Sequence, residues 1–88
     1  MTGPTCDHFE KLTSPADATS EVCDRCIAIG DTWVHLRSCL TCGNVGCCDN
    51  SKNRHARRHW EDHEHPLIKS IEPGEFWRYC FADQVIGQ

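Results

Sequence analysis

The sequence predicts a small α+β domain in which an antiparallel sheet carries one main helix. Three observations lead to this prediction. The chain has 88 residues, which is enough for one domain but too few to bury a large apolar core. Eight residues are Cys and six are His, a composition typical of metal ligands that stabilise a domain with a small core. Short segments with strand patterning surround a single segment with helical spacing.

The first part of the chain contains few large apolar side chains. We therefore expect residues 1–22 to be an N-terminal loop segment that carries Cys6 and His8, with a short helical turn after Ser14-Pro15. Residues 23–88 are expected to form the core, so that the chain is a single domain overall.

Four strands and one helix are predicted within this core. The strands show β-branched and aromatic residues between turn signals, and the helix follows the N-cap residues Asp49, Asn50 and Ser51 and is ended by Pro66. The predicted elements are strands at 32–37, 45–48, 67–71 and 76–81, with the helix at 52–62 and a turn at 72–75.

The N-terminal residues do not resemble a secretion signal. Met1-Thr2-Gly3-Pro4 has no basic start, and no apolar run follows it. No stretch approaches the roughly 18 apolar residues of a membrane span. We therefore expect a cytoplasmic protein with no membrane attachment. Cysteines in such a compartment are metal ligands more often than disulfides.

Two pairs of cysteines have the spacing of zinc knuckles. Cys23 and Cys26 form one pair, and Cys39 and Cys42 form the other. Each pair can place two sulfurs at about 2.3 Å from one zinc ion and so supply half of a tetrahedral site. Cys47 and several histidines remain to complete the two sites. Spacing alone leaves open which of them do so, namely His55, His59, His63 and His65.

The histidines of the predicted helix share one face. His55, His59 and His63 are spaced i, i+4, i+8. Two histidines at i, i+4 also occur in zinc proteases, but Ala56 stands where the general base of that motif would be. Because four protein ligands leave no open position on zinc, we do not expect an enzyme. His35 lies in a predicted strand and is expected not to bind metal.

The whole pattern resembles the ubiquitin-protease-type (UBP) zinc finger. It begins with Cys6-x-His8 and the two knuckles, continues through Cys47 and the histidines, and reaches His65-Pro66-Leu67 and a last aromatic strand that carries a cysteine. The resemblance extends from Cys6 to about Val85. It implies two cross-braced zinc sites and leaves His63 and Cys48 outside them. The implied ligands are Cys23, Cys26, Cys47 and His55 for one zinc, and Cys39, Cys42, His59 and His65 for the second.

Some members of the family hold a third zinc. This chain keeps Cys6, His8 and Cys80 from that site, but Trp77 replaces the remaining cysteine. Asp83 could supply the fourth ligand. The alternative is that Cys6, His8 and Cys80 only pack together or bind metal weakly.

The resemblance also implies a pocket for the free Gly-Gly terminus of ubiquitin. Trp33 matches a pocket residue, and Phe76 keeps an aromatic side chain on the last strand. Asp49 stands where the family has an Arg, and Arg78 and Asp83 stand where it shows Tyr. Because Asp49 would repel a terminal carboxylate, we expect no ubiquitin binding. Asp49 and Asp83 near an aromatic wall would suit a cationic group better.

The expected function is that of a zinc-binding module for a protein or peptide. The net charge of −4 and the pI near 5.8 argue against nucleic-acid binding through the helix, which remains one alternative. The basic side chains at Lys52, Arg54, Arg57 and Arg58 are expected to be a solvated face. Another alternative is a structural or redox-sensitive zinc protein with Cys48 as an exposed thiol. A monomer is expected.

Overall fold

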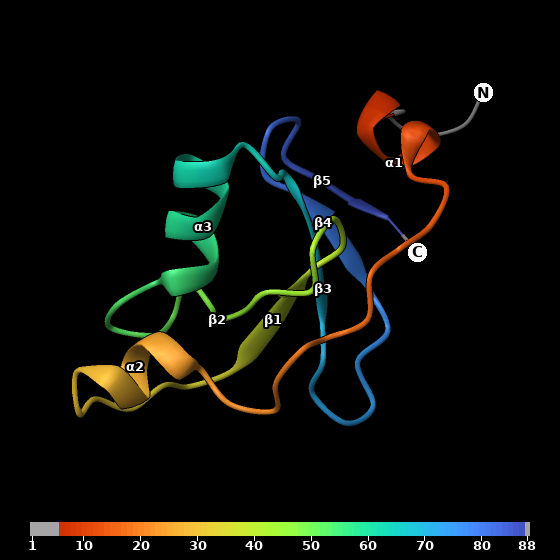
Figure 1. The fold of residues 1–88 in the computed structure, drawn as a ribbon. Coiled ribbons are helices and arrows are strands. Elements are labelled where there is room, and N and C mark those ends of the chain that lie inside the picture. The colour runs from red at the N-terminus through yellow and green to blue at the C-terminus, as the bar shows by residue number, and fades with distance from the viewer. Residues whose placement is uncertain (1–5, 88) are drawn as a thin grey trace.

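A five-stranded antiparallel sheet with the strand order β2-β1-β3-β4-β5 forms the centre of the molecule (Figure 1). The computed structural model describes residues 6–87. The strands are β1 (Leu36–Cys39), β2 (Val45–Cys47), β3 (Leu67–Ser70), β4 (Arg78–Cys80) and β5 (Val85–Gly87), and the helices are α1 (Asp7–Lys11), α2 (Asp24–Ala28) and α3 (His55–His63). The predicted α+β class, with one main helix on an antiparallel sheet, is confirmed.

The longest helix lies on one face of the sheet, over β1 and β2. Gly46 lies opposite Arg37 in the β1–β2 pair, and a Cβ at Gly46 would lie 2.6 Å from the backbone nitrogen of Ala56 in α3. On the same face, Ile68 of β3 lies opposite Tyr79 of β4. We call this side of the sheet the helix face.

The opposite face is covered by the N-terminal part of the chain. Phe9 and Leu12 pack on a buried cluster that includes Leu40 and Leu67. The backbone nitrogen of Ala16 donates to the carbonyl of Leu40 at 2.8 Å. The N-terminal segment therefore packs as part of the domain, and none of the helices in residues 6–87 has the length and apolarity needed to cross a membrane.

Several element boundaries differ from those predicted. The first strand begins at Leu36 and not at residue 32, because the backbone nitrogen of Val34 donates to Ser51 Oγ at 2.9 Å and not to a neighbouring strand. The helix begins at His55 and not at residue 52, after Arg54 in the left-handed region with φ 48°. Ser51 is thus engaged with Val34 and does not cap the helix.

Three elements were not predicted. The helix α2 lies where only a zinc knuckle was expected. The segment expected to be a loop contains α1, while the residues after Pro15 form no helical turn. The strand β5 pairs with β4 through Tyr79 and Ile86. All three elements are short, with five residues in each helix and three in the strand, and their stability comes from tertiary contacts and not from local sequence preference.

Candidate metal centre

The first cluster of donor atoms is completely buried. Cys23 lies before α2, Cys26 lies within it, Cys47 ends β2 and His55 begins α3. The four donor atoms lie within 4.8 Å of one another. His55 Nδ1 is 3.2 Å from Cys23 Sγ, 3.3 Å from Cys26 Sγ and 3.6 Å from Cys47 Sγ. The structure thus brings together the four residues that the resemblance implied for the first zinc. We call them cluster one.

A second cluster lies between the end of β1 and the middle of α3. Its donors are Cys39, Cys42, His59 and His65, again within 4.8 Å of one another. Cys42 Sγ is 3.3 Å from His59 Nε2, and His65 Nδ1 is 3.3 Å from the same nitrogen. These four residues, called cluster two, are those implied for the second zinc. The ring of His63 lies 4.7 Å from the ring of His59 but outside this donor set.

A third cluster joins the two ends of the described chain. Cys6 and His8 come from the N-terminal segment, while Cys80 and Asp83 come from β4 and the turn after it. His8 Nδ1 is 3.7 Å from Cys6 Sγ, 3.6 Å from Cys80 Sγ and 3.1 Å from Asp83 Oδ2. Hydrogen bonds from Cys6 and then from His8 lower the pKa of Asp83. We call this group cluster three.

The spacing of the donors fits tetrahedral zinc in all three clusters. Zn–S bonds of about 2.3 Å and Zn–N bonds of about 2.0–2.1 Å require donor separations of roughly 3.3–3.8 Å. Cys26 Sγ and Cys47 Sγ are 3.8 Å apart, and all eight cysteines are free. This separation is far longer than the roughly 2.05 Å of a disulfide.

Burial makes these sites depend on a cation. Desolvation raises the pKa of Cys26 to about 12 and that of Cys6 to about 11, and it lowers the pKa of His55 and His59. In the absence of a positive ion, the buried thiols therefore stay protonated and the imidazoles stay neutral. A zinc ion supplies the charge that a buried thiolate needs, at the cost of releasing protons.

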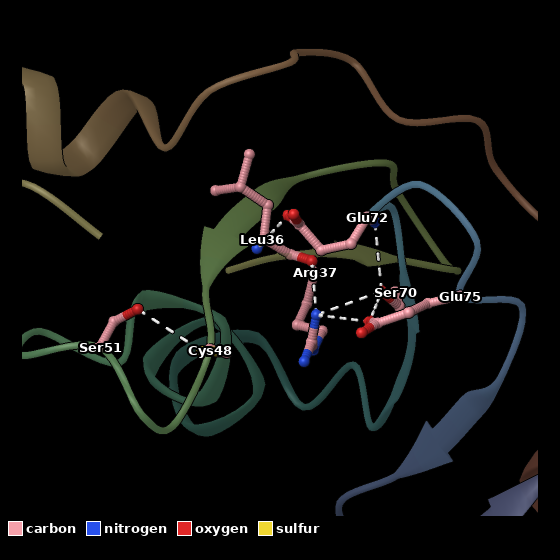
Figure 2. A network of polar contacts seen from close by, with 7 residues as sticks. All are labelled: Leu36, Arg37, Cys48, Ser51, Ser70, Glu72 and Glu75. Atoms are coloured by element: carbon pink, nitrogen blue, oxygen red, sulfur yellow. Dashed lines mark hydrogen bonds and ion pairs between the residues drawn. The ribbon is translucent and has the colours of Figure 1, made fainter. Parts of the chain in front are cut away.

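Cys48 is buried and not exposed. It keeps 4% of its accessible surface, and its sulfur lies 3.5 Å from Ser51 Oγ (Figure 2). Burial raises the pKa of Cys48, but hydrogen bonds from Ser51 and the backbone outweigh burial, so that the net shift is downward. The alternative in which Cys48 is an exposed thiol is therefore wrong. His35 is half-buried and belongs to none of the three clusters.

A cavity of about 380 Å³ opens on the helix face, beside α3 and over β3, β4 and β5. Its wall is formed by Arg37, Cys48, Asp49, Asn50, Ala56, Ile68, Trp77, Tyr79, Phe81 and Ile86. Of the four residues expected to bind a partner, this cavity contains Asp49 only. Trp33 packs against a buried cluster that includes Leu36 and Val45 and lines a separate hollow. Phe76 and Arg78 line a further hollow, where Phe76 is 87% exposed.

The alternation of side chains along β4 explains this difference. Tyr79 lies opposite Ile68 and faces the cavity, whereas Arg78 and Cys80 point to the other side of the sheet. The sequence reasoning therefore missed the aromatic side chains that line the cavity, namely Trp77, Tyr79 and Phe81. The available signal was Cys80: once it belongs to cluster three, its strand neighbours must face the other way.

Asp49 is not an unpaired anion. Arg57 Nη2 lies 2.6 Å from Asp49 Oδ2, and Arg57 Nε donates to both carboxylate oxygens at 3.1 and 3.0 Å. The Arg57 guanidinium also lies 5.0 Å from the ring centroid of Phe81. Asp83 belongs to cluster three and does not line the cavity. The two carboxylates therefore do not form the common anionic wall that was expected.

A second, more buried cation lies in the wall of the cavity. Arg37 Nη1 donates to the carbonyl of Leu36 at 2.9 Å and to Ser70 Oγ at 3.2 Å (Figure 2). The same nitrogen lies 3.6 Å from Glu75 Oε1, and the Arg37 side chain is 12% exposed. Its guanidinium carbon lies 4.5 Å from the ring centroid of Trp77. Arg37 is thus held in one position by its partners.

Comparison with known proteins gives a consistent result. The sequence profile of the family described as "Zn-finger in ubiquitin-hydrolases and other protein" matches residues 23–88. BRAP2 RING ZnF UBP domain-containing protein 2 of Arabidopsis thaliana is 38% identical over 81 residues, which are 83% of this chain and 17% of that protein. Ubiquitin carboxyl-terminal hydrolase 14 of Schizosaccharomyces pombe is 33% identical over 91 residues, which are 89% of this chain and 11% of that protein.

A solved structure is similar over almost the whole chain. The solution NMR structure of a protein from Rhodopseudomonas palustris matches with a TM-score of 0.83 and 42% sequence identity, covering 98% of this chain and 82% of that one. The chain spans less than a fifth of the two longer relatives named above. With the family profile on residues 23–88 and the donor clusters described above, the chain belongs to the family of zinc fingers found in ubiquitin hydrolases and other proteins.

Proposed function

We propose that this chain is a zinc-stabilised module that binds a peptide segment of another protein in the cavity of the helix face. In this proposal clusters one and two each hold one zinc ion through their four protein donors. A catalytic zinc site needs an open coordination position for water or substrate, and neither ion has one in this proposal. The protein is therefore a binding module and not an enzyme, and its eight free cysteines suit the reducing cytoplasm.

The apolar cavity is the observation that supports peptide binding. Three aromatic rings, Trp77, Tyr79 and Phe81, line it together with Ile68 and Ile86. Ile86 is 72% exposed, so a ligand can reach the cavity across β5. Large aromatic side chains around a concave site with few polar groups are typical of places where a partner buries an anchor residue.

The polar groups of the cavity argue for an extended apolar segment as the ligand. Asp49 is neutralised by Arg57, so neither side chain offers a strong unpaired charge. Ubiquitin stays outside this proposal, because the Arg57 guanidinium that could pair with a terminal carboxylate is already engaged by Asp49. Nucleic acid is also outside it, since Lys52 pairs with Asp31 at 3.4 Å and the chain is acidic overall.

The test compares two neighbouring residues that face opposite ways. Zinc-loaded protein is used to select binders from a display library of linear peptides, and selected peptides are titrated by amide NMR. Trp77→Ala should weaken binding by about 2 kcal/mol or more, the scale of an interface hot spot, which is about 30-fold or more in affinity. Phe76→Ala should leave affinity within about twofold, because that ring is exposed outside the cavity.

The position of the shifts gives a second check. Amide signals of Ile68, Tyr79 and Ile86 should move on binding, since these residues line the cavity. Equal losses of affinity in Trp77→Ala and Phe76→Ala, or shifts confined to the opposite face, would show that the cavity is not the binding site.

A further inference from the structure

Cluster three differs from the other two clusters in its position along the chain. His8 and Cys80 are 72 residues apart, so a metal bound here would join the N-terminal segment to the end of the sheet. The family profile begins at residue 23, and thus half of this cluster lies outside the matched region. Clusters one and two take all their donors from within it.

Cluster three also has weaker donors and more exposure. The carboxylate of Asp83 takes the place of a thiolate, and zinc prefers soft sulfur or imidazole donors in closed structural sites. The side chains of His8 and Asp83 are 42% and 41% exposed, whereas all four residues of cluster one are buried. Water and competing chelators can therefore reach the metal position of cluster three more easily than that of cluster one.

Few other contacts hold the first residues of the described segment. The helix α1 has five residues and none of them is buried. Phe9 lies against Gly87, where a Cβ would be 3.0 Å from the Phe9 ring, and Leu12 packs near Leu40. Beyond residue 15 the segment is attached by backbone hydrogen bonds, including Thr19 N to the carbonyl of Gly43 at 2.9 Å.

We infer that cluster three is an exchangeable metal site that acts as a clasp for residues 6–12. With metal bound, the clasp closes this segment over the sheet edge. When metal leaves cluster three and clusters one and two stay loaded, the segment detaches and uncovers the buried cluster that includes Leu40 and Leu67, on which Phe9 and Leu12 pack. Without metal the four side chains of the cluster are joined by sulfur contacts of 3.6 and 3.7 Å and by the exposed His8–Asp83 contact, and sulfur is a weak hydrogen-bond partner.

The clasp is a property of the opposite face and does not depend on peptide binding in the cavity. It makes the N-terminal segment sensitive to the free concentration of a divalent metal. It predicts that the metal of cluster three leaves first and that release of the segment accompanies this step.

The experiment uses the full chain loaded with zinc and exposed to chelators of increasing affinity. Metal content, amide NMR and alkylation of cysteines with mass spectrometry are followed together. We expect a first step in which one zinc leaves and only Cys6 and Cys80 become alkylated. In that step the amide signals of residues 6–12 should collapse to random-coil positions, while those of α3 keep their dispersion.

Variants at Asp83 test the role of the carboxylate. Asp83→Ala should raise the dissociation constant of the first-released zinc by at least about 100-fold, more than the 10–100-fold that loss of an outer-shell partner costs. Asp83→Cys supplies a third thiolate and should retain the metal against chelators that release it from the wild type. Asp7→Ala is the control, because Asp7 is exposed and outside the cluster, and it should behave as wild type.

Three results would overturn the inference. Loss of all zinc in a single step would show that cluster three is not separately exchangeable. Loss of one zinc with the signals of residues 6–12 unchanged would show that the metal does not hold the segment. Equal retention of zinc in Asp83→Ala and in the wild type would remove Asp83 from the site.

Discussion

The substitution Gly46→Ala probes the contact between β2 and α3 on which cluster one depends. A Cβ at position 46 would lie 2.6 Å from the nitrogen of Ala56 and 2.8 Å from the carbonyl carbon of His55, whereas ordinary contacts begin at 3.4 Å. Both atoms belong to the backbone, so the start of α3 must move away from β2 by about 0.8 Å. Since Cys47 follows Gly46 directly, this movement separates two donors of the same cluster.

The size of the movement determines the expected effect. Metal–donor distances are held within about 0.2 Å in well-formed sites, so a displacement of several tenths of an ångström cannot be absorbed by the zinc bonds alone. Overpacking of this kind costs about 1–3 kcal/mol. If the strain appears as weaker zinc binding, the affinity of cluster one should fall by about 5- to 150-fold.

The assay is competition for zinc with a coloured chelator, combined with NMR signals of the His55 ring to identify the site. Gly74→Ala is the matched control. Gly74 has a left-handed backbone conformation with φ 82°, which is strained for any residue with a side chain. No atom lies within 4 Å of a Cβ added there. It should lower the stability of the turn by about 1–2 kcal/mol and leave zinc affinity unchanged. Wild-type zinc affinity in Gly46→Ala would refute the proposed coupling between this contact and cluster one.

Two further predictions concern the metal sites. Cys39→Ser or His59→Ala should abolish dispersed amide signals, because structural zinc supplies about 10 kcal/mol or more, comparable to the stability of a whole domain. His63→Ala should keep the dispersed signals. Unfolding of this variant would mean that cluster two is wrongly assigned. The stability of the zinc-loaded protein should also fall as the pH is lowered. Burial lowers the pKa of His55 and His59, and both imidazoles must be neutral to bind zinc, so the unfolded chain binds protons that the native chain does not. The stability that these neutral histidines contribute is complete above the ordinary histidine pKa of about 6.5 and is lost as the pH falls towards their pKa values in the native state. The urea midpoint at pH 5.5 should therefore lie below that at pH 7.5. An unchanged midpoint would contradict the assignment of these histidines as buried and neutral.

The sequence could not by itself choose between His63 and His65. His63 follows His59 at helical spacing and looks like the better partner. In the structure the helix ends at His63, and Glu64 takes a left-handed conformation with φ 55°, which turns the chain so that His65 approaches His59. The resemblance to a known family implied this donor set, whereas periodicity describes only residues that remain inside the helix.

For β4, by contrast, the sequence did contain the information needed to decide which side chains face the cavity. A period of two allows either Phe76 and Arg78 or Trp77 and Tyr79 to face the helix side. The choice of Phe76 and Arg78 followed the family pattern position by position. Cys80 would have decided the matter, because a donor in cluster three must point to the opposite face, and its neighbour Tyr79 then faces the cavity.

The helix boundary depended on contacts between distant residues. Asp49, Asn50 and Ser51 have the composition of an N-cap, but Asp49 binds Arg57 and Ser51 accepts from Val34. The backbone nitrogen of His55 donates to Cys47 Sγ at 3.2 Å. The start of α3 is therefore set by its attachment to β2, and local preference gave way to this tertiary contact.

The order of the donors along the chain also determines when each metal site can form during synthesis. Cluster one has its last donor at His55, cluster two at His65 and cluster three at Asp83. A ribosome that adds about 5–20 residues per second therefore exposes the three cysteines of cluster one and four others before the first tetrahedral site can close. Over that interval the thiols are open to oxidation or to binding the wrong metal, and the supply of zinc to the nascent chain becomes part of how this small domain is made.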